Sequence, residues 1–437
     1  MANPELPVPD GLVLRPFRAL RFTVDDLAKV TSPPYDLIAE ADVRELLDSH
    51  PNNVVRLILP GTDRHRYGEA RETLRTWLST GVLVADETPA VYVYEQTGPG
   101  VLQRGLIGDV GLVALERQII LPHEDVMPGP VADRLALMRT TEANLEPIFL
   151  LYEGDGGMAT LLVNQIADSR APLVEAETRD GVRHRLWAIT NPHELASLDA
   201  DLRTRKALIA DGHHRYATYL ALQHEHHTLR RGQLASADDA PTPERPMRPG
   251  PWDFGLALLV DSNAYPPDLK AIHRVIPGLP LEEAVTRAKR AWHVHEHVGL
   301  AEGMAALKGF TGPAYLLSAG GPAYLLTNPD PDQVEQAMPT GRSARWRALN
   351  TSVLAEFLLP KIWGMNDNEQ SVRIVHHDPE KAVRLAHESG GTAVLLNPLT
   401  VDDVLAVAAQ RERVPRKSTS FGPKPRTGLV LRTFTFD

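Results

Sequence analysis

The sequence predicts an α+β protein with mixed sheets and flanking helices. Short apolar strands and amphipathic helices follow one another along the chain, and two pairs of strands are joined by the glycine-containing turns of hairpins. The 437 residues exceed the length of a typical single domain, so we expect at least two. Apolar residues make up 43% and charged residues 23%, as in globular proteins with a sizeable core.

The first predicted domain spans residues 11–231. Pro33 and Pro34 exclude a helix at residues 33–36, which we expect to be an ordered loop. Apolar runs predict strands at residues 12–20, 52–59, 90–94, 104–115, 147–152 and 207–210, and an alternating pattern predicts another at 183–189. The strands at 90–94 and 104–115 are expected to form a hairpin. Amphipathic patterns predict helices at residues 39–49, 69–80, 131–141, 158–167, 193–204 and 214–230.

The second predicted domain spans residues 252–437, with a C-terminal tail that is able to return to the functional site. Residues 232–251 lack periodicity and are rich in Pro, Ala, Asp and Arg, which indicates a linker or a long surface loop. Strands are predicted at 252–260, 314–317, 323–326, 372–376, 392–396 and 427–436. Helices are predicted at 281–292, 301–310, 345–363, 379–388 and 401–411. The alternation predicts an α/β domain.

Composition excludes several classes of function. The net charge of −10 argues against a broad nucleic-acid-binding face, and the absence of cysteine excludes disulfides, thiolate catalysis and cysteine–zinc sites. The first residues lack a secretory signal, and no apolar run approaches the ~20 residues of a membrane helix. We therefore expect a cytoplasmic protein without a membrane partner. Formation of a homo-oligomer is compatible with the sequence.

Residues 207–217 carry the most informative pattern. An apolar strand ends at Asp211 and Gly212, and a helical pattern begins after His213, His214 and Arg215. Such a junction directs backbone N–H groups and the positive end of the helix dipole at one point, where a phosphate binds well. The polar side chains face either solvent or a ligand, and we favour a ligand.

Two further polar segments are candidates. Glu124 lies in an irregular segment that Pro128 and Pro130 make rigid, and it can act as a general base if its pKa rises from ~4.3. From spacing alone, a solvated loop carboxylate is the better interpretation. Lys417, Ser418 and Thr419 suit phosphate oxygens, with a basic tail loop as the alternative.

His224 and His227 share a helix face and are candidate metal ligands, but their surroundings favour a solvated helix end.

The motifs LIADGHHRYA and LPHE resemble those of the free serine kinases of the ParB/sulfiredoxin-like superfamily. The chain as a whole resembles a large bacterial family, domain-of-unknown-function family one thousand and fifteen. The stretches that carry this second resemblance run from near residue 14 to near residue 432, and include RPFRAL, SPPYDLI, NNVVRLILP, ANLEPIFLLY and RKSTSFGPKPRTGLV.

The resemblance implies a ParB/sulfiredoxin-like nucleotide-binding core in residues 11–231. It implies that Glu124 is the general base and that Asp211 orients the reacting groups or a Mg²⁺ ion, with His213 as a third catalytic residue. The residues that it implies for binding the phosphates of ADP or ATP are Gly212, His213, His214, Arg215, Lys417, Ser418 and Thr419. The two motifs are further apart than in the compact kinases, which implies an insertion between them.

The predicted function is therefore nucleotide-dependent phosphoryl transfer to a small hydroxylated metabolite, with serine as the first choice. The alternative is a nucleotide-binding regulator related to ParB switches, which hydrolyses slowly or not at all. A third hypothesis, phosphoester hydrolysis at a histidine-rich metal site, is weaker. Sulfiredoxin chemistry is excluded because His213 stands where that family has its cysteine.

Overall fold

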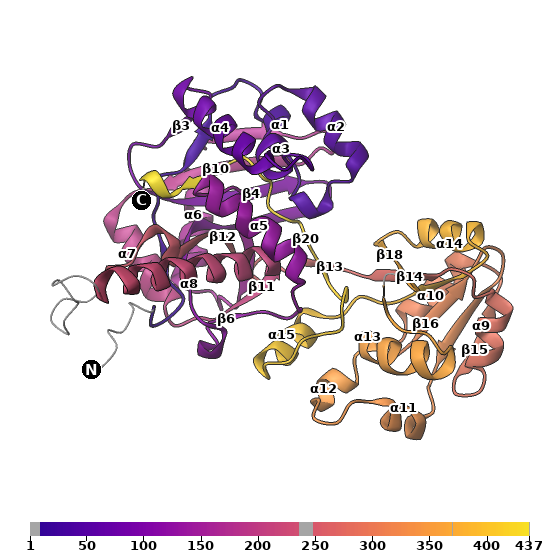
Figure 1. The fold of residues 1–437 in the computed structure, drawn as a ribbon. Coiled ribbons are helices and arrows are strands. Elements are labelled where there is room, and N and C mark those ends of the chain that lie inside the picture. Colours follow the sequence, from indigo (N-terminus) through magenta and orange to yellow (C-terminus); the bar gives the residue numbers. More distant parts are fainter. Residues whose placement is uncertain (1–8, 236–247, 369, 437) are drawn as a thin grey trace. The chain divides into compact units, whose positions relative to one another are not determined.

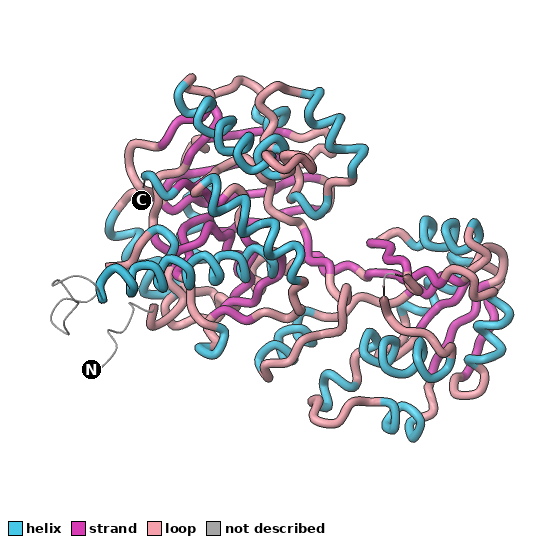
Figure 2. Tube along the Cα trace, in the orientation of Figure 1, coloured by secondary structure: helices cyan, strands magenta, loops and turns pink. Residues whose placement is uncertain are grey.

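The computed structural model describes residues 9–235, 248–368 and 370–436, which form two compact units (Figure 1). The N-terminal unit contains the described residues up to Pro122, those within Val126–Pro267, and those from Pro423 onward. The C-terminal unit contains His123–Asp125 and Asp268–Gly422. Each unit combines strands with flanking helices, so the chain has the mixed α+β architecture that its sequence predicts (Figure 2).

A mixed nine-stranded sheet forms the centre of the N-terminal unit. Pairing is parallel between β11 and β6 and between β12 and β8, and antiparallel elsewhere. The order is β6 (Ile120–Leu121), β11 (Ala207–Asp211), β8 (Ile148–Tyr152), β12 (Phe254–Asp261), β5 (Val101–Gly111), β4 (Val91–Gly98), β10 (Arg183–Ile189) and β9 (Val174–Glu177), with β1 (Leu14–Arg15) beside β5. The predicted hairpin of β4 and β5 is confirmed.

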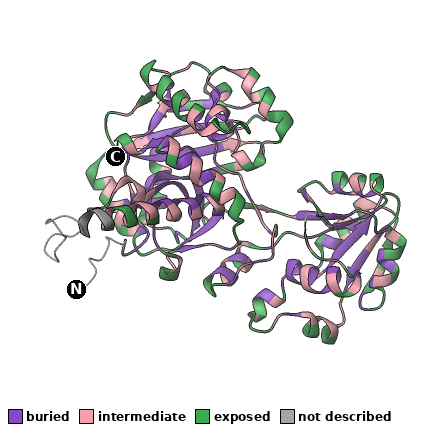
Figure 3. Ribbon diagram, viewed as in Figure 1, coloured by how far each residue is buried: buried purple, intermediate pink, exposed green. Residues whose placement is uncertain are grey.

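Helices flank this sheet. They are α1 (Leu27–Val30), α2 (Glu40–Ser49), α3 (Val55–Ile58), α4 (Arg66–Ser79), α5 (Pro128–Thr141), α6 (Met158–Ser169), α7 (Pro192–Leu202) and α8 (His213–Ala235). Figure 3 shows that burial is concentrated in the strands, and every residue of β8 and β11 is buried. Among the described residues, no helix has both the length and the apolar character needed to cross a bilayer.

The predicted domain boundary differs from the observed division. Most of residues 232–251 lies outside the described residues, because 236–247 are not described. The strand predicted at 252–260 is β12, and it pairs with β5 and β8 in the N-terminal sheet. The two units divide after Pro267.

The strand predicted at residues 52–59 is wrong, because this segment forms the short helix α3. Asn53 starts the helix by accepting a hydrogen bond from the Val55 N–H (2.9 Å), while its amide donates to the Lys29 carbonyl (2.8 Å). Val55, Leu57 and Ile58 are buried, and Leu57 and Ile58 share a core with α4 and the two-stranded pair β2 (Leu20–Phe22) and β3 (Leu83–Ala85). A buried apolar run this short does not distinguish a strand from a helix.

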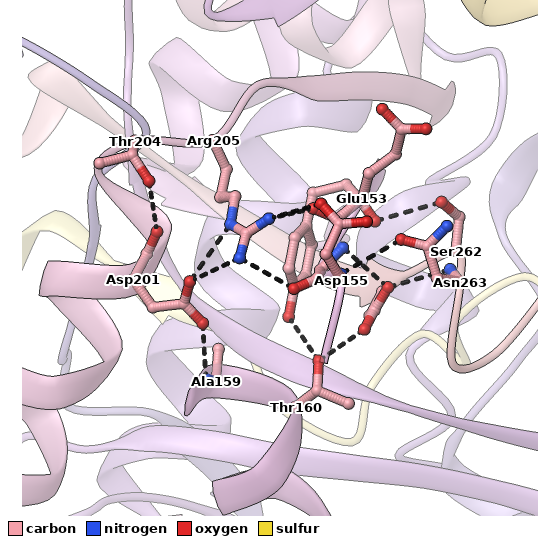
Figure 4. A network of polar contacts seen from close by, with 12 residues as sticks. Glu153, Asp155, Ala159, Thr160, Asp201, Thr204, Arg205, Ser262 and Asn263 are labelled. Carbon is pink, nitrogen blue, oxygen red and sulfur yellow. Dashed lines mark hydrogen bonds and ion pairs between the residues drawn. The ribbon is translucent and has the colours of Figure 1, made fainter. Parts of the chain in front are cut away.

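A polar network anchors the start of β11 (Figure 4). Arg205, two residues before the strand, donates to the carbonyls of Glu153 (2.7 Å) and Gly154 (2.8 Å) and pairs with Asp201 (2.9 Å). Asp261, at the end of β12, accepts from the Gly154 N–H (2.9 Å) and the Thr160 hydroxyl (2.6 Å). These contacts hold the β11 backbone in place, and its far end carries Asp211.

The C-terminal tail belongs to the N-terminal unit. A strand is predicted over residues 427–436, but only β21 (Arg432–Thr433) forms, against β7 (Ala143–Asn144), and a 3₁₀ turn follows it. Single bridges tie Thr427 to Ser32 and Leu431 to Leu20. The tail is extended but is paired only at intervals, so the continuous strand is a wrong prediction.

The C-terminal unit has a six-stranded sheet and a small two-stranded pair. The sheet order is β15 (His293–His297), β17 (Ala323–Thr327), β16 (Tyr315–Ser318), β19 (Thr392–Leu395), β14 (Ile272–Ile276) and β18 (Arg373–His376), and β13 (Asp268–Lys270) pairs with β20 (Ser420–Gly422). The helices are α9 (Leu281–Ala288), α10 (Leu300–Lys308), α11 (Pro331–Ala337), α12 (Ala344–Arg347), α13 (Asn350–Val353), α14 (Pro379–Glu388) and α15 (Val401–Ala409). All pairings in this sheet are antiparallel, whereas parallel strands are typical of an α/β domain.

The single helix predicted at residues 345–363 is wrong. The segment divides into α12, α13 and a π-helical stretch, Leu354–Ile362. Leu349 has extended backbone angles and separates the first two helices, and Pro360 lies within the third. Because proline cannot donate a helical hydrogen bond, a regular α-helix does not continue through it.

Candidate functional site at the start of α8

The predicted strand–turn–helix junction is present. β11 ends at Asp211, Gly212 has a left-handed φ of +94°, and the 23-residue helix α8 begins at His213. A Cβ atom at position 212 would lie 3.0 Å from Ile148 Cγ2 and 3.2 Å from Arg215 Nε. Both the φ angle and the lack of space therefore require glycine here.

Asp211 is held between two cationic side chains. Its Oδ2 accepts a hydrogen bond from Arg215 Nη2, and its Oδ1 pairs with Lys424 Nζ. Arg215 also donates from Nη1 to the Pro147 carbonyl (2.5 Å). The side chains of Asp211, Arg215 and Lys424 are 9%, 5% and 14% exposed, so these interactions are only weakly screened by water.

One buried N–H of this network has no partner. Among the described residues, Arg215 Nε finds no hydrogen-bond acceptor. It is the atom that lies against Gly212, at the turn from which α8 begins. An unsatisfied donor on a buried cation, beside the positive end of a helix dipole, favours an anionic oxygen as ligand.

Lys424 is a site residue that the sequence analysis missed. It comes from the C-terminal tail, between Pro423 and Pro425, and its ammonium lies 3.3 Å from Asp36 Oδ2 as well as against Asp211. The sequence predicts Lys417 in the same basic segment instead. The available signal was the position of Lys424 between two prolines, which keep the chain extended.

The charges of this network shift one another's protonation. Burial raises the pKa of Asp36, but the Lys424 ammonium outweighs it and holds the pKa below its ordinary value. Burial lowers the pKa of Lys424, and the carboxylates of Asp211 and Asp36 outweigh it and raise the pKa. Burial raises the pKa of Glu146, which accepts from the Tyr35 N–H (2.9 Å). The Asp36–Lys424 contact is therefore an ion pair over the neutral pH range.

The two histidines of the motif differ in their surroundings. His213 is buried, with 8% of its surface exposed, at the first position of α8. His214 accepts a hydrogen bond on Nε2 from the Met127 N–H (3.0 Å), just before α5. That nitrogen carries no proton in this arrangement, so it cannot donate to a phosphate.

Glu124 belongs to the C-terminal unit, where it meets one of the predicted tail residues. Its Oε1 accepts a hydrogen bond from the Thr419 hydroxyl (2.9 Å), and the same hydroxyl lies 2.8 Å from His123 Nε2. The edge of the His123 ring packs against Phe421, and the His123 carbonyl accepts from the Val414 N–H. Thus Glu124 and Thr419, nearly 300 residues apart in sequence, are brought together.

The rest of the predicted tail segment is shaped by a buried arginine of β14. Arg274, 1% exposed, donates to the carbonyls of Arg416 (3.1 Å) and Lys417 (2.9 Å). Burial lowers its pKa to about 10. The Ser418 hydroxyl donates to the Pro415 carbonyl (2.6 Å), and Lys417 is exposed with a φ of +51°.

The predicted site residues thus fall into two groups. Residues 211–215 lie in the N-terminal unit, and Glu124 with residues 417–419 in the C-terminal unit.

The histidines later in α8 do not form a metal site. His227 Nε2 lies 2.6 Å from Asp253 Oδ1, and His226 stacks on Trp252 at 4.1 Å. No group of three or more acidic or histidine side chains is placed to hold a metal ion anywhere in the part of the chain that the structure describes.

Solved structures of low similarity cover about three quarters of the chain. A free serine kinase in complex with AMP is 14% identical, with 73% of this chain and 87% of that chain covered and a TM-score of 0.33. A mutant free serine kinase in complex with ADP is 13% identical over the same shares, with a TM-score of 0.34. A conserved hypothetical protein from Pyrococcus furiosus is 13% identical, covers 73% and 90%, and has a TM-score of 0.32.

No curated protein matches the chain. A family match covers most of it, from residue 14 to residue 352. The chain belongs to the family described as "Protein of unknown function (DUF1015)".

Proposed function

We propose that this protein is a nucleotide-dependent phosphotransferase that acts on a small hydroxylated metabolite, in the manner of the free serine kinases that its two motifs resemble. The start of α8 binds the phosphates of ADP or ATP through the backbone of residues 213–215, within a ParB/sulfiredoxin-like core. The observation that carries the proposal is the junction itself, where Gly212 allows a close backbone approach and the buried Arg215 Nε lacks an acceptor.

The charge at the junction supports a phosphate ligand. Arg215 and Lys424 share the Asp211 carboxylate, and Lys424 also pairs with Asp36, so Arg215 Nε is the cationic donor that is left for a phosphate. Phosphoryl transfer needs chiefly correct positioning and neutralisation of charge on the phosphoryl oxygens. In this proposal Asp211 fixes both cations, and His213, at the first position of α8, completes the phosphate site.

The chemistry of Glu124 supports a role as general base. It already accepts a hydrogen bond from one hydroxyl, that of Thr419, at 2.9 Å. A base needs the same contact with the hydroxyl of the acceptor. In the reaction the acceptor oxygen bonds to the terminal phosphorus, the bond from that phosphorus to the leaving phosphate oxygen breaks, and Glu124 takes the hydroxyl proton.

Asp211 does not fit a metal ion held by the protein alone. Both of its carboxylate oxygens bind cationic side chains, and no group of three or more acidic or histidine side chains among the described residues is placed to hold a metal ion.

Phosphorus NMR of the full chain with ADP or ATP and a panel of amino acids and sugars tests the proposal. We expect a new phosphate ester with serine or another hydroxylated acceptor. Glu124→Gln is expected to lower kcat by at least about 100-fold and to leave the nucleotide Kd within a factor of about three, because the base acts only in the transition state. Glu153→Gln, an exposed carboxylate of the N-terminal unit, is the charge-matched control.

The alternative function gives a different result in the same experiments. Tight nucleotide binding by calorimetry, with no phosphate ester under any condition, would establish the nucleotide-binding regulator. Absence of both binding and ester would remove both functions.

A further inference from the structure

The N-terminal unit contains a cavity of about 490 Å³ that the proposed function does not use. It is lined by residues of the 26–49 segment, which includes α1 and α2, by the turn between β9 and β10, and by Arg426 of the tail. Ala28, Leu37, Ile38 and Leu46 give it apolar walls. This volume lies in the range of about 300–1,000 Å³ that is typical of small-molecule sites.

The carboxylates around the cavity already have partners. Asp26 pairs with Lys29 and Glu45 pairs with Arg179, so the charges of these two lining cations are neutralised. Glu177 pairs with Arg183, and Asp42 accepts a hydrogen bond from the backbone N–H of residue 39. Asp180 accepts hydrogen bonds from the Thr178 hydroxyl and the Val182 N–H.

Arg426, the third cation of the lining, differs from Lys29 and Arg179. No carboxylate among the described residues lies within ion-pair distance of its guanidinium. Its Nε donates to the Thr31 hydroxyl (3.0 Å) and its Nη2 to the Thr31 carbonyl (3.2 Å). A guanidinium has five N–H donors, so three are left without an acceptor in the part of the chain that the structure describes. Burial lowers the pKa of Arg426, and Tyr94 and Asp180 only partly oppose this effect.

We propose that this cavity binds a small organic oxyanion, a carboxylate or a phosphate monoester with an apolar body, whose charged end accepts hydrogen bonds from Arg426. Removing a cation from water without a counter-ion is costly, and a bidentate oxyanion supplies both the charge and the acceptors. The apolar walls suit the rest of the molecule. The proposal does not depend on phosphoryl transfer at α8.

A ligand-observed NMR titration of the full chain with benzoate, phenyl phosphate and neutral benzamide tests it. We expect saturable binding of at least one of the two anions and none of benzamide. The preferred anion shows whether the site takes a carboxylate or a phosphate.

Two variants assign the binding to the cavity. Arg426→Gln is expected to raise Kd by at least about tenfold, because it removes a charged donor. Ala28→Glu leaves Arg426 in place and adds a carboxylate to the cavity wall, so it is also expected to raise Kd by at least about tenfold. Its melting temperature should stay close to that of the wild type. Arg203→Gln, with the same charge change outside the lining, should leave Kd unchanged.

Three results would overturn the proposal. One is failure of both anions to bind, and another is binding that survives both Arg426→Gln and Ala28→Glu. The third is binding that is lost in Gly212→Ala and kept in Arg426→Gln, since that would place the anion at the start of α8.

Discussion

Gly212→Ala changes the junction at its tightest point, and its cost can be worked out from the structure. A φ of +94° costs an L-residue about 1 kcal/mol relative to glycine. The new Cβ atom would also lie 3.0 Å from Ile148 Cγ2 and 3.2 Å from the buried Arg215, and overpacking of this kind adds about 1–3 kcal/mol. We therefore expect a loss of about 2–4 kcal/mol in the free energy of unfolding.

Gly61 provides a matched control in the same unit. Its φ is +95°, and a Cβ atom there would meet nothing within 4 Å. Gly61→Ala therefore carries the dihedral cost alone, about 1 kcal/mol. Urea unfolding of both variants, followed by circular dichroism, measures the difference.

Nucleotide binding by the same two variants links stability to the site. Gly212→Ala is expected to weaken ADP binding by at least about tenfold, because the N–H groups at the start of α8 must shift, and Gly61→Ala is expected to leave it unchanged. If the two variants were equally stable and bound ADP equally well, the argument from the junction would be refuted.

Two further predictions concern buried charge. Lys424→Met leaves Asp211 paired with Arg215 alone and is expected to lower the free energy of unfolding, measured by urea titration, by about 3 kcal/mol. Lys270→Met removes a half-exposed pair and is expected to lower it by less than about 1 kcal/mol. Equal losses would contradict the role of Lys424. Burial lowers the pKa of His184 to about 4, so unfolding takes up a proton between pH 6.5 and 4. The free energy of unfolding is therefore expected to fall by about 3 kcal/mol as pH is lowered through that window, and His184→Gln should abolish this fall. A His184 ring that titrates near 6.5 in the folded protein would contradict the prediction.

Local patterns predicted much of the fold and part of the site. The alternation of polar and apolar residues in 183–189 predicted β10 at its observed bounds, and Asp211-Gly212 marked the junction between β11 and α8. These features depend on neighbouring residues, so their signals are contained within a few positions of the sequence.

The features that the sequence did not reveal depend on contacts between distant segments. Residues 55–58 are helical where the Asn53 side chain accepts from the Val55 N–H and where Leu57 and Ile58 join a core formed with distant segments. The pairing of Lys424 with Asp211 joins the tail to a strand more than 200 residues earlier. The buried contacts of Arg274 with the 416–417 backbone likewise join distant segments. Periodicity carries no information about such partners.

A crystal structure of the full chain with ADP tests the central claim most directly. We predict phosphate oxygens within hydrogen-bonding distance of the backbone N–H groups of residues 213–215, with Arg215 Nε facing them. Phosphates bound elsewhere in the protein, with the start of α8 in contact only with solvent, would contradict it.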